Sequence, residues 1–206
     1  MIKKFAKSNH SSRPGVLTFD DFCWMVEDGE KADLINGAIY MASPDNLFAN
    51  ALCLWLSSLI ALYISKNQLG RVFISRVAFR LDDLNCPEPD IAFLDKKHKN
   101  RLRKGHVLGA PNLAMEIVSP DSVERDYVTK QKLYEAAGVR EYWIIDEFKK
   151  LVTLLRLDSR GKYREVRPQK GLLYSQVIKG FWLDPSWLWQ EPLPDTLETL
   201  HLIQLH

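Results

Sequence analysis

The chain has 206 residues, of which 46% are hydrophobic and 26% charged, and its formal net charge is +2. This profile is typical of a soluble globular protein with one sizeable core, and we expect a flexible lead-in over residues 1–17 and a single domain over residues 18–206. The three widely spaced cysteines, Cys23, Cys53 and Cys86, exclude a disulfide framework and a cysteine metal site, so a cytoplasmic protein is expected. The net charge neither favours nor excludes a nucleic-acid partner, because phosphate binding depends on local clusters of charge.

Capping residues mark the first predicted elements. Thr18 and Asp21 have the spacing of a capping box, which predicts a short helix that ends near Gly29. The run GAIYMA, residues 37–42, is then predicted to form a strand.

The segment from Leu47 to Ile64 is uncharged over about the length of a membrane span. Small and polar residues recur along it at helical spacing, which favours the core helix of a soluble protein, with no membrane as partner. Asp45 and Asn46 are candidate N-caps, and Gly70 comes after the helix stops. A membrane-associated protein is the alternative, and detergent-dependent solubility would reveal it.

Strands alternate with one further helix in the rest of the chain. Strands are predicted over residues 71–81, 89–95, 112–119, 141–146 and 151–157, and a helix over residues 126–137. The GKY sequence at Gly161 predicts a hairpin turn, whereas the tail from Pro185 onward shows no clear pattern. This order predicts an α/β fold with a mixed central β-sheet flanked by helices.

Two acidic residues stand out against this apolar background. Glu116 lies in the middle of the apolar run LAMEIV, where an unpaired charge costs several kcal/mol, so it needs a cation, a hydrogen-bond partner or a route to water. Asp90 follows Pro89 directly and opens a predicted strand. Taken alone, an Asp that follows Pro at the start of a strand is more often a turn residue than a ligand.

Lys130 is a third candidate site residue, because helical phasing places it on the apolar face of its predicted helix. At 100° per residue it shares a face with Tyr127, Tyr134 and other apolar residues, whereas Lys132 points elsewhere. A lysine on an apolar face can also snorkel to water or pair with Asp126 at i,i+4. Two acids on neighbouring strands and an inward lysine on the next helix form a set that suits a divalent cation and a phosphate.

The sequence stretches PEPDIAFLD, LAMEIVSPDS and RDYVTKQKLYEAAGVREYWIID, in this order, closely resemble the Uma-two family of predicted nucleases. This family is a branch of the restriction-endonuclease-like PD-(D/E)XK superfamily. The likeness runs from about Phe19 to Trp189 and includes ADLINGAIYMASP near the start and IKGFWLD near the end.

The resemblance implies a Mg²⁺ site, with Mn²⁺ as a substitute. Asp90 and Glu116 match the two acids that coordinate the metal, with the backbone carbonyl of Ile117 as a further ligand. Val118 stands where the superfamily usually has its lysine, and Lys130 matches a lysine relocated to the following helix. Asp33 matches the position of an upstream acid with a supporting metal role. Relatives often have a histidine at the start of the long helix, where this chain has DNLFAN, so no role tied to that histidine carries over.

A basic segment suggests how nucleic acid could bind. Between the two proposed metal-binding strands, KKHKNRLRKGH carries six cations without an acid: Lys96, Lys97, Lys99, Arg101, Arg103 and Lys104. Such a run is often only a solvated loop. Because it joins the strands of Asp90 and Glu116, we expect it over or beside the site, in contact with backbone phosphates.

Together these features predict a Mg²⁺-dependent endonuclease that hydrolyses phosphodiester bonds in DNA, with Asp90, Glu116 and Lys130 as the catalytic set. A homodimer is expected because cutting both strands takes two sites. The rival hypothesis is a catalytically inactive nucleic-acid-binding or scaffold protein with a nuclease fold, which the missing strand lysine makes credible.

Overall fold

A six-stranded mixed sheet is the centre of the structure, a computed structural model that describes residues 15–27, 29–44 and 46–205. Its strand order is β10-β9-β8-β7-β5-β3, in which β7 and β8 are parallel and all other neighbours antiparallel. The strands are β3 (Gly70–Ile74), β5 (Ile91–Asp95), β7 (Leu113–Ile117), β8 (Glu141–Asp146), β9 (Leu151–Leu157) and β10 (Tyr163–Glu165). The predicted α/β fold with a mixed central sheet is confirmed.

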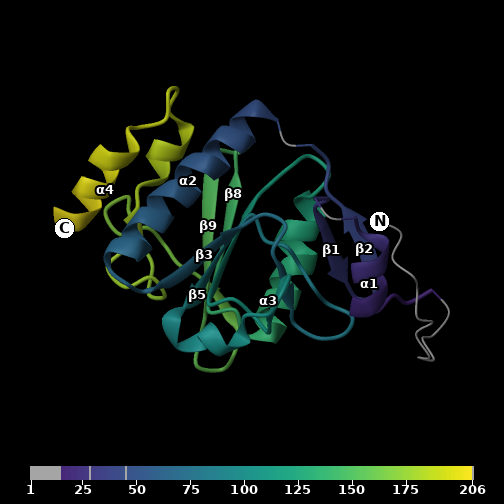
Figure 1. Cartoon of the computed structure of the whole chain (residues 1–206). Helices are drawn as coiled ribbons and strands as arrows, with labels where there is room; N and C mark the ends of the chain where they lie inside the picture. The colour runs from purple at the N-terminus through teal and green to yellow at the C-terminus, as the bar shows by residue number, and fades with distance from the viewer. Residues whose placement is uncertain (1–14, 28, 45, 206) are drawn as a thin grey trace.

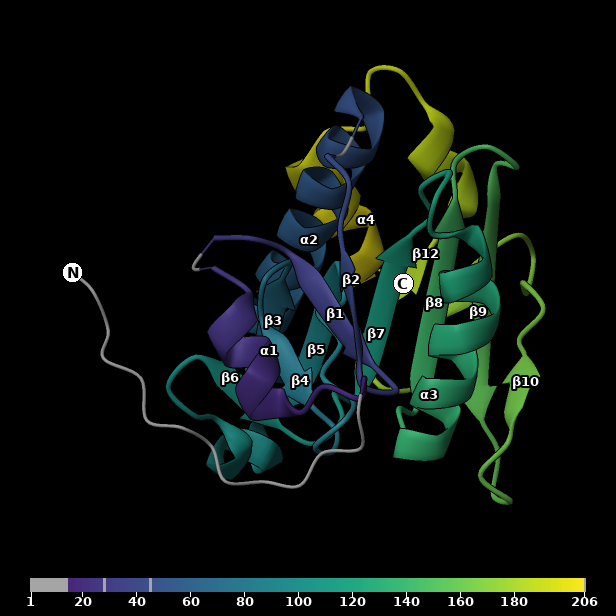
Figure 2. The same cartoon turned by 90° about the vertical axis from the view of Figure 1, so that its right-hand side faces the viewer.

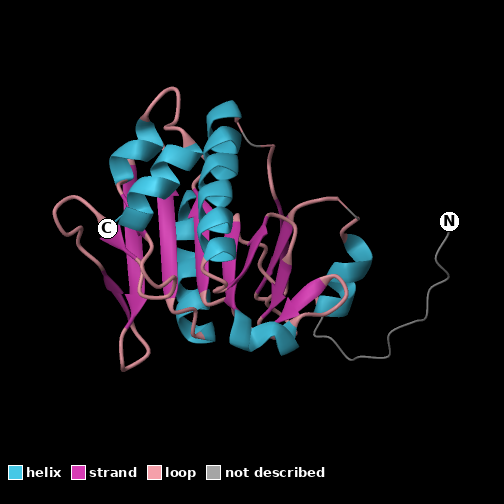
Figure 3. Ribbon diagram, turned by 60° about the vertical axis from the view of Figure 1, so that its left-hand side comes forward, coloured by secondary structure: helices cyan, strands magenta, loops and turns pink. Residues whose placement is uncertain are grey.

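Helices cover both faces of this sheet (Figures 1 and 2). On one face lie α2 (Leu47–Lys66), η3 (Pro185–Trp189) and α4 (Thr196–Leu205), with the short strands β11 (Leu173–Tyr174) and β12 (Trp182–Leu183); Figure 3 shows α2 and α4 against the sheet. On the other face, the π-helical segment η2 (Arg125–Lys130) continues into α3 (Gln131–Ala137). Residues of β7 alternate between the two, so Met115 faces α2 and Ala114 faces α3.

Smaller elements stand beside the sheet. The hairpin of β1 (Ala32–Ile35) and β2 (Ala38–Met41) and the parallel pair of β4 (Ala78–Arg80) and β6 (His106–Leu108) form two separate sheets, with α1 (Phe19–Met25) packed against them. The 3-10 helix η1 (Lys96–Arg101) connects β5 to β6.

The predicted helix caps are confirmed. Thr18 and Asp21 form the reciprocal capping box, and the Asn46 side chain accepts a hydrogen bond from the backbone N–H of Ala49 at 2.8 Å. Asp45, the other candidate cap, lies outside the described residues. The helix that Thr18 opens ends at Met25, earlier than expected.

Several predicted boundaries differ from the structure. The expected strand over residues 71–81 is two strands, β3 and β4, because Arg76 between them has a left-handed φ of 62° that a continuous strand does not allow. Gly70 begins β3, where a Cβ would lie 2.1 Å from the carbonyl oxygen of Leu94. Strand β1 and helix α4 were not predicted, whereas the hairpin turn at Gly161 is confirmed between β9 and β10.

Only the end of the expected lead-in belongs to the described structure, since residues 1–14 lie outside it. Leu17 donates a backbone hydrogen bond to Gly37 at 2.8 Å and packs against the cluster around α1. This part of the lead-in is therefore held by the β1–β2 hairpin.

Helix α2 is long and apolar enough to cross a membrane by length and composition alone. In the structure it packs as a core helix, as its sequence pattern favoured, and eight of its side chains are buried. Leu56 is fully buried, whereas Leu54, two residues earlier, is 65% exposed.

This contrast gives a matched test of the packing. We expect Leu56→Ala to lower the free energy of unfolding by about 2–5 kcal/mol, because it leaves a cavity in the core. Leu54→Ala should stay within about 0.5 kcal/mol of the parent chain. Urea denaturation measures both, and equal losses would show that this helix does not pack on the sheet as described.

Candidate active site

Glu116 has buried partners on the helix that covers its face of the sheet. Its Oε1 lies 2.9 Å from the Lys130 Nζ and accepts a hydrogen bond of 2.8 Å from the Tyr134 hydroxyl. Glu116 and Lys130 are each 2% exposed. The carboxylate in the apolar strand is therefore held by a cation and a phenol hydroxyl, from residues about one helical turn apart on the same face.

Lys130 joins the helix to the N-terminal hairpin. Its Nζ lies 2.9 Å from Asp33 Oδ2 on β1, and Asp33 Oδ1 accepts a hydrogen bond of 2.8 Å from the backbone N–H of Glu88. Both oxygens of Asp33 thus have partners, which gives Asp33 the geometry of a group that positions Lys130. As phasing predicted, Lys130 points inward and Lys132 is exposed.

Asp90 sits at the start of β5, beside the end of the antiparallel neighbour β7. Its Oδ2 accepts a hydrogen bond of 2.7 Å from the backbone N–H of Ile117, and its Oδ1 pairs with the ammonium group of Lys31. Within a strand, the N–H and C=O of one residue point the same way, so the Ile117 carbonyl also faces this side. Asp90 and Glu116 line one small cavity, as their predicted placement on neighbouring strands requires.

Asp126 is the third acid around Lys130. Its Oδ1 lies 3.7 Å from the Lys130 Nζ, and its Oδ2 accepts a hydrogen bond from the Ser122 hydroxyl. Among the described residues, neither Asp126 Oδ1 nor the Nε of Arg125 has a hydrogen-bond partner, although both are buried. Two polar atoms at this cavity therefore retain unused bonding capacity.

The cluster contains more negative groups than positive ones. Five acids (Asp33, Glu88, Asp90, Glu116 and Asp126) face three cations (Lys31, Arg125 and Lys130). Burial raises the pKa of Glu116 above its usual range, which the Lys130 ammonium only partly offsets, and burial raises the pKa of Glu88 to about 7. Burial opposes the charge of Lys130, but the carboxylates of Asp33, Glu116 and Asp126 raise its pKa well above the usual value. A divalent cation would complement this excess of acid.

The expected ligand set does not depend on side chains alone. In the part of the chain that the structure describes, no three acidic, histidine or cysteine side chains are placed to hold a metal together. The set proposed from the sequence is different, namely two carboxylates and the Ile117 carbonyl, and the residues Asp90, Glu116 and Ile117 all line the same cavity. Hard oxygen donors of this kind are those that Mg²⁺ prefers.

The basic segment does not lie where it was expected. Asp90 precedes β5, whereas η1 and residues 102–104 follow the other end of that strand, about 17 Å away for five residues of strand. The expectation that the segment covers the site was wrong, because joining two antiparallel strands places the connection at the end away from Asp90. The guanidinium groups of Arg101 and Arg103 donate to backbone carbonyls of Ala110, Asn100 and Leu102, and the lysines Lys96, Lys97, Lys99 and Lys104 are exposed.

Lys31 and Glu88 are site residues that the sequence reasoning missed. Each stands two positions before a predicted acid, in the patterns Lys31-x-Asp33 and Glu88-x-Asp90. Residues two apart in extended chain point to the same side, so this spacing was the available signal. It becomes informative only once β1 is recognised as a strand.

Comparison with known proteins identifies the family of this chain. The chain belongs to the Uma2 family, described as "Putative restriction endonuclease", whose profile matches residues 17–186. It is similar in fold to a solved structure from Anabaena variabilis ATCC 29413, titled as a putative nuclease belonging to DUF820, with a TM-score of 0.70 and 19% sequence identity over 84% of this chain and 97% of the other. No curated protein matches the chain. The family and the fold support a nuclease-like function.

The pairing of Lys130 predicts a large effect on stability. Lys130→Met should lower the free energy of unfolding by about 3–5 kcal/mol, because it leaves the buried Glu116 without its cation and Asp33 with only the more distant Arg125, at 3.8 Å. Lys132→Met, on the exposed side of the same helix, should change it by less than about 0.5 kcal/mol. Denaturation in EDTA measures both variants, and a Lys130→Met protein as stable as the parent chain would contradict the described ion pairs.

Proposed function

We propose that the protein is a Mg²⁺-dependent endonuclease that hydrolyses phosphodiester bonds in DNA, with Mn²⁺ as an alternative metal. The observation that carries the proposal is the arrangement in which Asp90, Glu116, Ile117 and Lys130 line one cavity, with Lys130 paired to Glu116. The Uma2 family membership supports the same class of reaction.

Asp90, Glu116 and the Ile117 carbonyl are the groups that would hold the metal. When bound, a divalent ion of this kind polarises a phosphate and lowers the pKa of a coordinated water. Lys31 pairs with Asp90 Oδ1 in the structure, so Asp90 would exchange this ammonium for the metal. A divalent ion would favour that exchange by stabilising the ionised form of Glu116, whose pKa is raised by burial and by the neighbouring acids.

Lys130 would supply positive charge at the phosphate. Asp33 and Glu116 fix its ammonium group from two sides at 2.9 Å, which holds it in one position. A positioned charge of this kind contributes roughly 2.7–4 kcal/mol to the stabilisation of a transition state. Val118, which replaces the usual strand lysine, is 1% exposed in the apolar cluster beneath α3 and leaves this role to Lys130.

A catalytically inactive nucleic-acid-binding protein is the second candidate. The pairing of Lys31 with Asp90 favours it, because a cation already occupies one oxygen of a proposed metal ligand. For cleavage of both strands of a duplex we propose a homodimer, which would bring two sites together.

Metal-dependent cleavage separates the two candidates. We expect cleavage of mixed DNA substrates in Mg²⁺ or Mn²⁺ and none in EDTA, and Asp90→Asn or Glu116→Gln should abolish it while the protein stays folded. Glu165→Gln, an exposed acid on β10, is the control and should cleave normally. Full cleavage by either site variant would refute the metal site, and absence of cleavage by the parent chain with intact DNA binding would establish the second candidate.

Because the basic segment lies away from the acids, only a sufficiently long DNA substrate would contact it. A strand length of about 17 Å corresponds to about five base pairs, so a DNA seated at the acids reaches η1 only if it extends past them. Replacing Lys96, Lys97 and Lys99 with alanine should weaken binding of a duplex of about 30 base pairs and flatten its salt dependence by up to about 0.9 per lost contact. Binding of an oligonucleotide of about five nucleotides should not change. An unchanged salt slope with the long duplex would mean that the segment is only solvated.

A further inference from the structure

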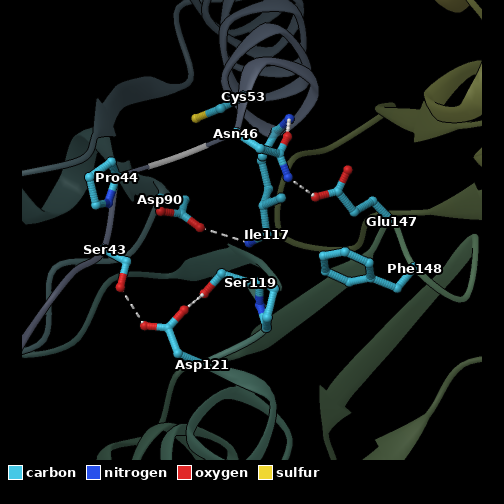
Figure 4. Close-up of a pocket in the computed structure, with 12 residues that line it drawn as sticks. Ser43, Pro44, Asn46, Cys53, Asp90, Ile117, Ser119, Asp121, Glu147 and Phe148 are labelled. Atoms are coloured by element: carbon cyan, nitrogen blue, oxygen red, sulfur yellow. Dashed lines mark hydrogen bonds between the residues drawn. The ribbon is translucent and has the colours of Figure 1, made fainter.

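A second, larger cavity opens directly beside the acids (Figure 4). It has a volume of about 340 Å³ and shares Asp90 and Ile117 with the catalytic cluster. Its outer walls come from the segment before α2, the loop after β7 and the turn after β8. The residues that determine its chemistry are Ser43, Asn46, Ser119, Asp121, Glu147 and Phe148.

The polar atoms of this cavity are mainly acceptors. The hydroxyl groups of Ser43 and Ser119 donate to Asp121 at 2.7 and 2.9 Å, and these two bonds lower the pKa of Asp121 and keep it ionised. The Asn46 amide donates to Glu147 Oε1 at 2.6 Å. Because these donors are used within the protein, a ligand must itself bring donor groups.

The aromatic wall is Phe148. Its side chain is 58% exposed, so it contributes little to the core. Figure 4 shows Phe148 and Glu147 together on one side of Ile117 and Asp90 on the other. An exposed ring beside a hydrogen-bond acceptor provides both a stacking surface and an edge contact for a flat polar ring.

The charges of the two adjoining cavities suit different parts of a nucleotide, the phosphate in the smaller cavity and the base in the larger one. Asp121 and Glu147 repel a phosphate, whereas the acids of the smaller cavity would be offset by Lys31, Lys130 and the divalent ion of the proposed function. A phosphate therefore belongs beside Asp90 and the lysines. The larger cavity is left for the neighbouring base, and its 340 Å³ is at the low end for ligand pockets and too small for a base pair with its backbones.

We propose that this cavity is a nucleobase subsite that receives one unpaired base next to the scissile phosphate. The base stacks on Phe148 and donates its exocyclic amino group to Glu147. This inference rests on the proposed nuclease function and narrows its substrate to single-stranded or locally unpaired DNA. Adenine, cytosine and guanine have exocyclic amino groups and thymine has none, so thymine should be the poorest occupant.

The test is binding of duplexes that carry one bulged nucleotide, measured by fluorescence anisotropy with Ca²⁺ in place of Mg²⁺ to prevent turnover. The bulged position holds adenine, thymine or an abasic sugar, and a fully paired duplex is the reference. We expect the adenine bulge to bind most tightly, and Phe148→Ala should weaken its binding roughly 5- to 150-fold, the usual range for one stacked base. The abasic bulge should bind equally well to both proteins.

Two further variants check the assignment. Trp24→Ala, which removes an exposed aromatic side chain on α1 outside the cavity, should leave the adenine preference intact. Glu147→Gln should reduce the preference for adenine over thymine, by roughly tenfold or more if a charged hydrogen bond is lost. Thermal melting of each variant confirms that it is folded.

The subsite is refuted if the parent chain does not distinguish adenine from an abasic bulge, or if Phe148→Ala keeps the distinction. Either result can coexist with Mg²⁺-dependent cleavage that needs Asp90 and Glu116, in which case only the subsite fails. If the parent chain neither binds nor cleaves any of these substrates, the proposed function fails as well.

Discussion

The ammonium group of Lys130, buried between Asp33 and Glu116, is the contact on which the site depends. It connects the β1–β2 hairpin, the central sheet and the helix over that sheet through one charged atom. Without it the buried carboxylates of Asp33, Glu116 and Asp126 would lose the cation they share, which costs several kcal/mol. The same contact therefore holds the elements in place and concentrates charge where a phosphate would react.

The site also shows that the position of the positive charge matters more than the secondary-structure element that supplies it. In the strand, Val118 packs beneath α3 with Tyr134 and Tyr142, and no lysine could enter that apolar cluster without a partner. The lysine instead reaches Glu116 from the helix, whose π-helical turn brings Asp126 and Lys130 to the buried side. Lys130 thus places a positive charge beside Glu116 from the helix, in place of a lysine at the position of Val118.

Much of this site follows from periodicity in the sequence, and the rest depends on tertiary packing. Glu116 is recognisable because a charge interrupts an apolar strand, and Lys130 because helical phasing turns it inward. Lys31 is not, because its role appears only when the hairpin packs against β5 and β7. The basic segment was misplaced because strand direction decides which end of the sheet a connection occupies, and composition contains no information on direction. The long predicted strand failed at Arg76, where one left-handed residue separates β3 from β4.

Within the residues that the structure describes, the β1–β2 hairpin forms a two-stranded sheet of its own and pairs with no strand of the central sheet. Lys31 and Asp33 are therefore carried on a body that is joined to the rest mainly through side chains, loop contacts and a bridge from Leu34 to Cys86. A small rotation of this body would move one cation away from Asp90 and loosen the hold on Lys130 in the same motion. Any motion that opened the cavity at the hairpin would therefore also change the charges that surround Asp90 and Lys130.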